Sequence, residues 1–322
     1  MRIFITGASG FIGGAIATSL KSSHTLFGMA RSEKSADKLK KRGVQPVLCS
    51  LSDIQAQHLV DIDIVIHAAA FVEPWGSRKQ FWDANVIGTQ NVLKAAQAAG
   101  VNRFIHIGTE AVLFDGQDMI DIDENTPYPA HTPFLYSETK REAEKLVLAG
   151  NSASMTTISI RPRLVWGPND TSILPNLLEL VDKGAFRWIE KGQLLTSSTH
   201  IANLVDGVTR ALDQGRGGQA YFITDGPAQT MQKFLTLLLA TEGRHPDNKN
   251  APGWLVRTAA WGIEAIWKIF GIRKKPPITR FAASIMSRHC TIRIDKAKSE
   301  LAYTPVVSVE KGMAELKAAN GH

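Results

Sequence analysis

The sequence has little of what marks several protein classes. Its 322 residues include two cysteines, Cys49 and Cys290, which form neither a metal-binding nor a redox spacing. Uninterrupted apolar runs are too short to cross a bilayer, and the N-terminus enters an apolar run directly, which leaves no room for a signal peptide. We therefore expect reduced cysteines, no metal site and a cytoplasmic protein.

The chain also lacks a long basic tract, although its net charge is +7. The short run Arg273–Lys275 is not interleaved with aromatic residues, as nucleic-acid-binding segments are. A solvated surface together with an anionic cofactor accounts for the charge, so we expect no nucleic-acid partner. Hydrophobic residues make up 44% of the chain, which is enough to bury a sizeable core.

The strongest pattern in the sequence stands at its start. Arg2–Thr6 is an apolar run that predicts a buried parallel strand, and T-G-A-S-G-F-I-G-G follows, before an apolar segment with helical spacing. Gly7 permits a sharp turn, Gly10 lets a diphosphate approach the backbone, and Gly13 lets the helix pack closely on the strand. With the N–H groups of the helix start, this predicts a dinucleotide site, against a plain turn as the alternative.

Short apolar runs alternate with helical segments through about the first half of the chain. We expect further strands over residues 25–30, 45–49, 63–67 and 102–108. The alternation predicts an α/β fold with a Rossmann-type, doubly wound parallel sheet over residues 1–168, with later strand contributions from about 196–224. It loosens from about Asn169, so we expect residues 169–322 to form a smaller, mainly substrate-binding portion.

The end of the second predicted strand bears on the cofactor. An acidic residue at this point binds the adenosine ribose hydroxyls, whereas an arginine accommodates a ribose phosphate. This chain has Arg31, with Lys34 and Lys38 behind it. The charge favours NADP(H) over NAD(H). The alternative is that Arg31 is a surface charge and Glu33 binds the ribose.

Two later strand ends carry further candidates. Ala68, Ala69 and Ala70 follow the fourth predicted strand, where small residues let the backbone lie against a flat ring or a phosphate. We expect His67, just before them, to be packed and hydrogen-bonded rather than catalytic. Thr109 follows the fifth predicted strand, at the edge where open α/β sheets bind their ligands, so its hydroxyl is well placed for a substrate.

Tyr136 and Lys140 are four residues apart on one face of a helix that we expect to begin at Thr132 and Pro133, with the threonine as its cap. A phenol with a pKa of about 10 is too weak an acid to work as a base near neutrality. A neighbouring ammonium favours the phenolate and lowers that pKa. An exposed pair without a function is the alternative, and the glycine pattern upstream favours the catalytic interpretation.

Together, T-G-A-S-G-F-I-G, Asn85 in D-A-N-V-I-G-T-Q-N, Thr109 and Y-S-E-T-K resemble the extended short-chain dehydrogenase/reductase superfamily, over nearly the whole chain. The resemblance implies that Tyr136 is the general acid/base, that Lys140 tunes it and holds the nicotinamide ribose, and that Thr109 orients the reacting oxygen. Asn85 occupies the superfamily's usual asparagine. The implied cofactor contacts are Gly7, Ser9, Gly10, Phe11, Ile12, Gly13, Arg31, Ser50, Leu51, Ala68, Ala69, Ala70, Tyr136, Lys140, Pro162 and Arg163.

Within the superfamily, W-G-S-R-K-Q-F-W-D-A-N and the C-terminal half are most similar to the 3β-hydroxysteroid dehydrogenase and sterol-decarboxylating branch and to related bacterial ketone reductases. Two positions depart from the superfamily's pattern. Ser50 stands where an aspartate often contacts the adenine amine, and Thr109 replaces the commoner serine. The resemblance also suggests a homodimer through helices near 81–99 and 133–149.

Residues 254–270 predict a helix with Arg257, Glu264 and Lys268 on one narrow stripe and apolar residues elsewhere. Such a helix must bury most of its surface. Three partners remain open: the protein's own core, an apolar substrate, or a membrane surface contacted through residues 254–275.

These features predict an NAD(P)-dependent oxidoreductase that moves a hydride between nicotinamide and a secondary alcohol or ketone. The apolar C-terminal half indicates a largely apolar substrate, steroid-like or a long-chain β-keto compound. One alternative is a nucleotide-sugar epimerase or dehydratase, in which the hydride returns to the substrate. Another is a dinucleotide-binding sensor without turnover, which has no need of Thr109, Tyr136 and Lys140 together.

Overall fold

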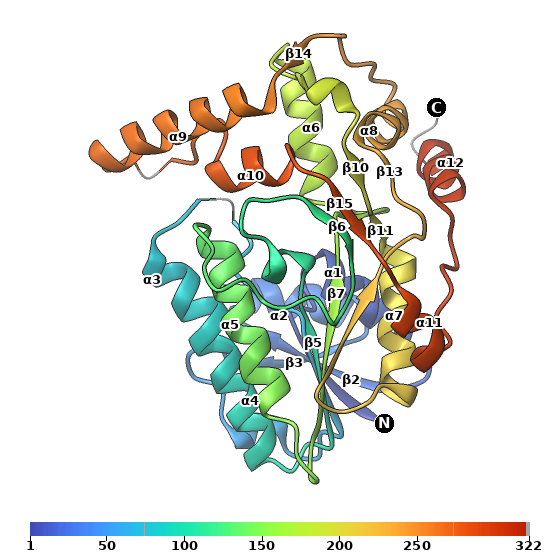
Figure 1. Cartoon of the computed structure of the whole chain (residues 1–322). Coiled ribbons are helices and arrows are strands. Elements are labelled where there is room, and N and C mark those ends of the chain that lie inside the picture. The colour runs from blue at the N-terminus through green and yellow to red at the C-terminus, as the bar shows by residue number, and fades with distance from the viewer. Residues whose placement is uncertain (74, 273, 320–322) are drawn as a thin grey trace.

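A seven-stranded parallel sheet forms the centre of the computed structural model, which describes residues 1–73, 75–272 and 274–319 (Figure 1). Arg273 of the short basic run lies outside the described residues. The strand order is β12-β7-β5-β4-β1-β2-β3. The strands are Arg2–Thr6 (β1), Thr25–Ala30 (β2), Gln45–Leu48 (β3), Ile64–His67 (β4), Arg103–Ile107 (β5), Thr156–Pro162 (β7) and Gln219–Ile223 (β12).

The order of the strands reverses at β1, which pairs with β2 on one side and with β4 on the other. In doubly wound sheets, the crevice for the ligand lies outside the strand ends at this point. All five strands predicted in the first half are present, and the predicted α/β fold is confirmed. β12, from the stretch 196–224, pairs with β7 at one edge of the sheet.

Helices cover both faces of the sheet, because successive strand residues point to opposite sides. Ile3 and Ile5 of β1 belong to the core that holds α1, α2 and α7, whereas Phe4 belongs to the core that holds α4 and α5. These helices are Phe11–Leu20 (α1), Glu33–Lys41 (α2), Gly88–Ala98 (α4), Leu135–Ala149 (α5) and Ile201–Gln214 (α7).

A smaller region packs above the strand ends, around the mixed sheet β13-β10-β15-β6 (Figure 1). Its strands are Met119–Ile122 (β6), Leu195–Thr196 (β10), Gln229–Thr230 (β13) and Cys290–Ile292 (β15), with the short pairs Val165–Trp166 (β8) and Thr199–His200 (β11), and Trp188–Ile189 (β9) and Asn250–Ala251 (β14). Its helices are Ile173–Asp182 (α6), Met231–Ala240 (α8), Gly253–Ile269 (α9), Arg280–Ile285 (α10), Asp295–Leu301 (α11) and Val309–Ala319 (α12). The division at residue 168 stays a prediction. β6 precedes this residue but pairs with β15, which follows it, and β12 follows it but pairs with β7, which precedes it.

Two predicted helices begin elsewhere. The helix expected over 81–99 starts with Arg78–Phe81 (α3) and passes through a π-helical turn, Trp82–Ile87, before α4. The expectation that Thr132 caps α5 is wrong, since Phe134 is the N-cap residue. The Thr132 hydroxyl instead donates to the Phe114 carbonyl oxygen, at 2.8 Å, and is thereby used in a tertiary contact.

Three expectations about absent features concern the described residues. None of the helices in that part of the chain is long and apolar enough to span a membrane. Cys49 and Cys290 are free and buried. The same residues contain no group of three or more His, Cys, Asp or Glu side chains that could hold a metal ion.

Candidate active site

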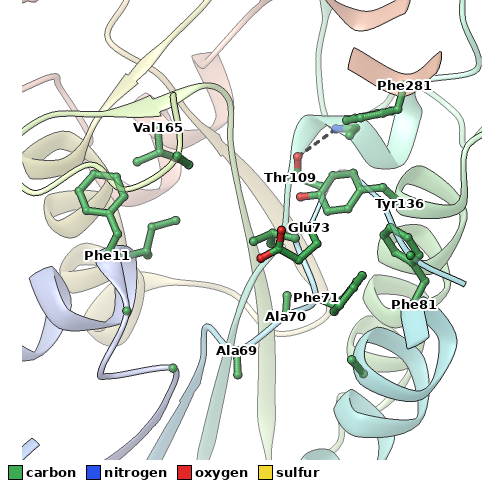
Figure 2. A pocket seen from close by; sticks show the side chains of 18 of the residues that line it. Phe11, Ala69, Ala70, Phe71, Glu73, Phe81, Thr109, Tyr136, Val165 and Phe281 are labelled. Carbon is green, nitrogen blue, oxygen red and sulfur yellow. Dashed lines mark hydrogen bonds between the residues drawn. The ribbon is translucent and has the colours of Figure 1, made fainter. Parts of the chain in front are cut away.

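A cleft of about 880 Å³ lies outside the carboxyl ends of the central strands. The turn after β1, residues Ala68–Ala70 after β4, and Thr109 after β5 all line it, and Tyr136 reaches it from α5 (Figure 2). The topology therefore brings together four groups of residues that the sequence marks separately. The cleft has two ends, which we name the cofactor end, around the glycine turn, and the substrate end, around Tyr136.

The glycine turn at the cofactor end is built for close approach. Gly7 has a φ of +73°, and the Gly10 N–H donates to its carbonyl oxygen at 2.9 Å. A Cβ atom at Gly13 would stand 2.6 Å from the Gly7 carbonyl carbon, so α1 starts directly against the turn. Gly10 is the N-cap of α1 and provides no side chain that bonds the first N–H groups. This cradle of backbone at a helix N-terminus fits the diphosphate of a dinucleotide.

Arg42 supports this turn and was missed by sequence reasoning. Its guanidinium donates to the carbonyl oxygens of Ala8, at 2.6 Å, and Gly10, at 3.3 Å. The side chain comes from the end of α2 and thereby links the turn to the neighbouring βα unit. No sequence signal marks it, because the contact depends on how α2 packs.

Most of the predicted cofactor contacts line the cleft, namely Gly7, Ser9, Gly10, Phe11, Ile12, Gly13, Arg31, Leu51, Ala68, Ala69, Ala70, Tyr136 and Pro162. Ser50, Lys140 and Arg163 are not among its lining residues. The Ser50 hydroxyl donates to Asp53 at 2.9 Å, and Arg163 is buried in an ion pair with Glu110. These three remain predicted contacts.

Tyr136 and Thr109 meet at the substrate end, where the Tyr136 hydroxyl lies beside Thr109 (Figure 2). Burial, first, and then the charge of Glu110 raise the pKa of Tyr136 above its usual value. The expectation that Lys140 lowers this pKa is wrong for the structure described here. Lys140 donates to the Ile107 carbonyl oxygen at 2.8 Å, and burial lowers its own pKa to about 8.

Asn85 lies in the π-helical turn and fixes the loop after β4. Its side-chain oxygen accepts from the Phe71 N–H at 2.7 Å, and its amide donates to the Phe71 carbonyl at 3.2 Å and to Thr139 at 3.1 Å. It does not line the cleft, so the contacts described give it a positioning role. His67 is packed and hydrogen-bonded to Thr6 and Thr89, as expected, and burial lowers its pKa to about 3.

Aromatic side chains form much of the substrate end, namely Phe71, Trp75, Phe81, Phe134 and Phe281. The Phe281 ring centroid lies 5.2 Å from that of Tyr136 (Figure 2). Glu264 and Lys268 of α9 and Arg280 of α10 also line the cleft, so two of the three charged residues of the α9 stripe contribute to it. The arrangement suits a substrate that is apolar around its reacting group.

Comparison with known proteins agrees with this geometry. The model of the 3-beta hydroxysteroid dehydrogenase/isomerase family matches residues 4–251. The chain is 37% identical to the 4-hydroxy-2-methyl-3-oxo-4-farnesyl-3,4-dihydroquinoline-1-oxide ketoreductase of Stigmatella aurantiaca, over 99% of this chain and 96% of the relative. It is 32% identical to a 2-alkyl-3-oxoalkanoate reductase of Stenotrophomonas maltophilia, over 99% of each.

Solved structures show the same fold at lower identity. The UDP-glucuronic acid 4-epimerase from Bacillus cereus, solved in complex with NAD, has a TM-score of 0.75 at 19% identity, over 99% of this chain and 100% of that one. The likeness supports the fold and not the epimerase reaction. The family match and the two reductases therefore carry the assignment: the chain belongs to the 3-beta hydroxysteroid dehydrogenase/isomerase family and is an NAD(P)-dependent oxidoreductase of the extended short-chain dehydrogenase/reductase type.

Proposed function

We propose that this protein is an NADP(H)-dependent ketoreductase that converts a ketone on an apolar substrate to a secondary alcohol. The observation that carries the proposal is the Tyr136 hydroxyl, which lies beside Thr109 in an aromatic pocket that opens onto the glycine cradle. Both curated reductases described above are named for substrates with a 3-oxo group, one with a farnesyl and one with an alkyl substituent. An aromatic pocket suits such substituents.

The residues at the substrate end supply the proton. NADPH bound in the cradle would supply the hydride, which goes to the carbonyl carbon. Tyr136 donates its phenolic proton to the carbonyl oxygen, so that the C=O group becomes an alcohol, and the phenol then regains a proton from solvent. The phenol of Tyr136 is protonated at neutral pH, so the proton that it donates is present. Lys140 would hold the nicotinamide ribose, as the family resemblance implies.

The direct test is NADPH oxidation with a panel of 2-alkyl-3-oxo acids, prenylated ring ketones, steroid ketones and nucleotide sugars. We expect turnover with the first two groups, and a loss of at least about 100-fold in kcat for Tyr136→Phe with cofactor binding retained. Near-wild-type turnover of folded Tyr136→Phe would overturn the mechanism. Conversion of a nucleotide sugar with no net change in the cofactor would support the epimerase alternative instead.

We propose NADP(H) as the preferred cofactor because of the wall beside the adenosine ribose. Arg31, Ser32 and Ser35 line the cleft there, whereas Glu33 does not. Among the described residues Arg31 forms no ion pair, so its guanidinium is available to a ribose phosphate. Arg31→Ser should raise the KM for NADPH about tenfold and leave that for NADH unchanged. Lys40→Ser, farther along α2 and outside the lining of the cleft, is the control, and equal effects on both cofactors would contradict the preference.

We also propose that the outer face of α9 contacts an anionic membrane surface. Exposed side chains on this face include Trp254, Trp261 (60% exposed) and Ile269 (77% exposed), while Glu264 of the charged stripe is buried against the cleft. Lys274 and Lys275 follow the helix and are also exposed, which complements a negative surface. Figure 1 shows α9 projecting from the rest of the chain, next to the cleft-lining α10. A membrane-bound helix here would place the cleft beside a lipophilic substrate.

Vesicle flotation tests this contact. Wild-type protein should float with phosphatidylglycerol vesicles, bind phosphatidylcholine vesicles weakly, and lose binding in Trp261→Lys and Ile269→Lys, with activity on a water-soluble ketone retained. Lys40→Glu, on exposed α2, is the control. Concentration-dependent dimers that are lost in the same variants, without flotation, would overturn the proposal. The homodimer expected through 81–99 and 133–149 stays a separate prediction, which sedimentation velocity would test.

A further inference from the structure

Glu110 follows Thr109 and begins the short 3₁₀ helix Glu110–Leu113 (η3) after β5. Its side chain is only 6% exposed, although the residue lines the cleft. Both carboxylate oxygens are bonded: Oε1 accepts from Arg163 at 2.6 Å, and Oε2 accepts from the Thr109 hydroxyl at 2.7 Å. A buried carboxylate of this kind is costly unless it is paired, and here its partners are one guanidinium and one active-site hydroxyl.

The bond to Glu110 determines what Thr109 offers to a substrate. A threonine hydroxyl has one proton, and a carboxylate is a stronger acceptor than a neutral oxygen. The Thr109 oxygen also accepts from the Ala111 N–H at 3.2 Å. Thr109 therefore presents a lone pair to the cleft rather than a proton. A ketone oxygen needs a donor, and the Tyr136 hydroxyl supplies it.

We propose that Glu110 is a positioning residue for ketone reduction: it takes the Thr109 proton, so that Tyr136 is the hydroxyl that donates to the carbonyl oxygen. The inference rests on the proposed function and deepens it, because it names the residue that sets the donor. The negative charge of Glu110 also favours the protonated form of Tyr136, since it raises the pKa of this phenol. Reduction of a ketone needs the protonated phenol, whereas oxidation of an alcohol needs the phenolate.

The surroundings of the pair hold the Glu110 carboxylate in place. Arg163 is buried, and its Nε also donates to Thr196 at 3.1 Å, which fixes the guanidinium behind the carboxylate. The Cys290 thiol lies in the same cluster, and burial raises its pKa to about 12, so it is neutral. Lys140 lies on the helix of Tyr136 but is bonded to Ile107. The other charged residues that line the cleft are Arg31, Glu73, Glu264, Lys268 and Arg280.

The test is the pH titration of the Tyr136 phenol in Glu110→Gln. The variant removes the negative charge and frees the Thr109 proton for the phenol oxygen, and both changes lower the pKa of Tyr136. Ultraviolet difference spectra should show this phenolate forming about 1 pH unit lower than in the wild type, with Tyr136→Phe identifying the signal. The rate of ketone reduction should decrease, and alcohol oxidation should begin, at a pH that is lower than in the wild type by the same amount. The spectra require no turnover, so they test Glu110 even if the proposed substrate is wrong.

A matched variant separates this effect from simple loss of a buried ion pair. Glu144→Gln breaks the buried pair between Glu144 and Arg161, whose atoms are 2.6 Å apart, and Glu144 is not among the charges that shift Tyr136. It should lose stability without moving the Tyr136 titration. If Glu110→Gln does not fold, Glu110→Gln/Arg163→Met removes both charges and should shift the phenol in the same direction. An unchanged titration in the folded Glu110 variant, or equal shifts in both glutamate variants, would overturn the proposal.

Discussion

The two ends of the cleft are lined by different parts of the chain, one mainly by backbone and the other mainly by side chains. The cofactor end is backbone and small residues, in which Gly7, Gly13 and Ala68 lie so close that an added Cβ atom at either glycine would meet neighbouring backbone. The substrate end is side chains, with the rings of Phe71, Phe81 and Phe281 around Tyr136 (Figure 2). The cofactor end should therefore lose ligand binding when any atom is added. At the substrate end, the loss of substrate affinity should grow with the number of atoms removed.

Of the substitutions in the cleft, the addition of one carbon atom at the cofactor end should have the largest effect on ligand binding. In Gly13→Ala the new methyl would stand 2.6 Å from the Gly7 carbonyl carbon, and this neighbour is backbone that cannot turn aside. The start of α1 must then move away from the turn, and its N–H groups lose their place for a diphosphate. We expect NADPH binding to fall below detection in a fluorescence titration, together with a lowered melting temperature.

Gly262→Ala in α9 is the matched control for that variant. A Cβ atom there would meet nothing within 4 Å, and alanine is the better helix former. Cofactor affinity should stay at the wild-type value. Retained NADPH binding in folded Gly13→Ala would show that the two ends of the cleft do not differ as described.

The same contrast explains what the sequence predicts and what it does not. The strand Arg2–Thr6 and the turn at Gly7 follow from neighbouring residues, because apolar runs and glycine spacing act locally. Phe281 reaches Tyr136 only through the packing of α10, which no local pattern encodes.

Tertiary contacts also change the roles of residues that local patterns mark correctly. Thr132 has the chemistry of a helix cap, yet its hydroxyl bonds Phe114. Arg163 is one of the cofactor contacts that the resemblance implies, yet it pairs with Glu110 in the interior. The acidic residue beside Thr109 is the one sequence signal that could have pointed to this pair.

Lys140 is buried on the helix that carries Tyr136, outside the lining of the cleft, and should show the cost of burying a charge there. Burial lowers its pKa to about 8 from a usual value of 10.5, so the unfolded chain binds more protons than the folded chain between these pH values. The stability of the wild type should therefore rise as pH increases from about 8 to 10.5. Lys140→Met lacks this linkage and should be more stable than the wild type at pH 7, by about 1–3 kcal/mol.

Urea unfolding at several pH values measures both effects. The stability advantage of Lys140→Met should shrink between pH 8 and 10, because the wild type then loses its buried charge. Lys145→Met, on the exposed part of the same helix, is the control and should leave the pH dependence unchanged. A variant at Lys140 that is less stable than the wild type at pH 7 would mean that the bond to Ile107 outweighs the burial of the charge.

The removal of one aromatic ring at the substrate end should have the smallest effect on ligand binding. Phe281→Ala removes a ring that packs 5.2 Å from Tyr136, without adding anything to the cofactor end. We expect the KM for an apolar ketone to rise about tenfold, which corresponds to the loss of one aromatic contact, with kcat within about twofold and the KM for NADPH unchanged. Phe270→Ala is the control, because this ring is exposed and does not line the cleft. A loss of NADPH affinity in Phe281→Ala would mean that the aromatic wall also shapes the cradle, and the two ends would then have to be treated as one site.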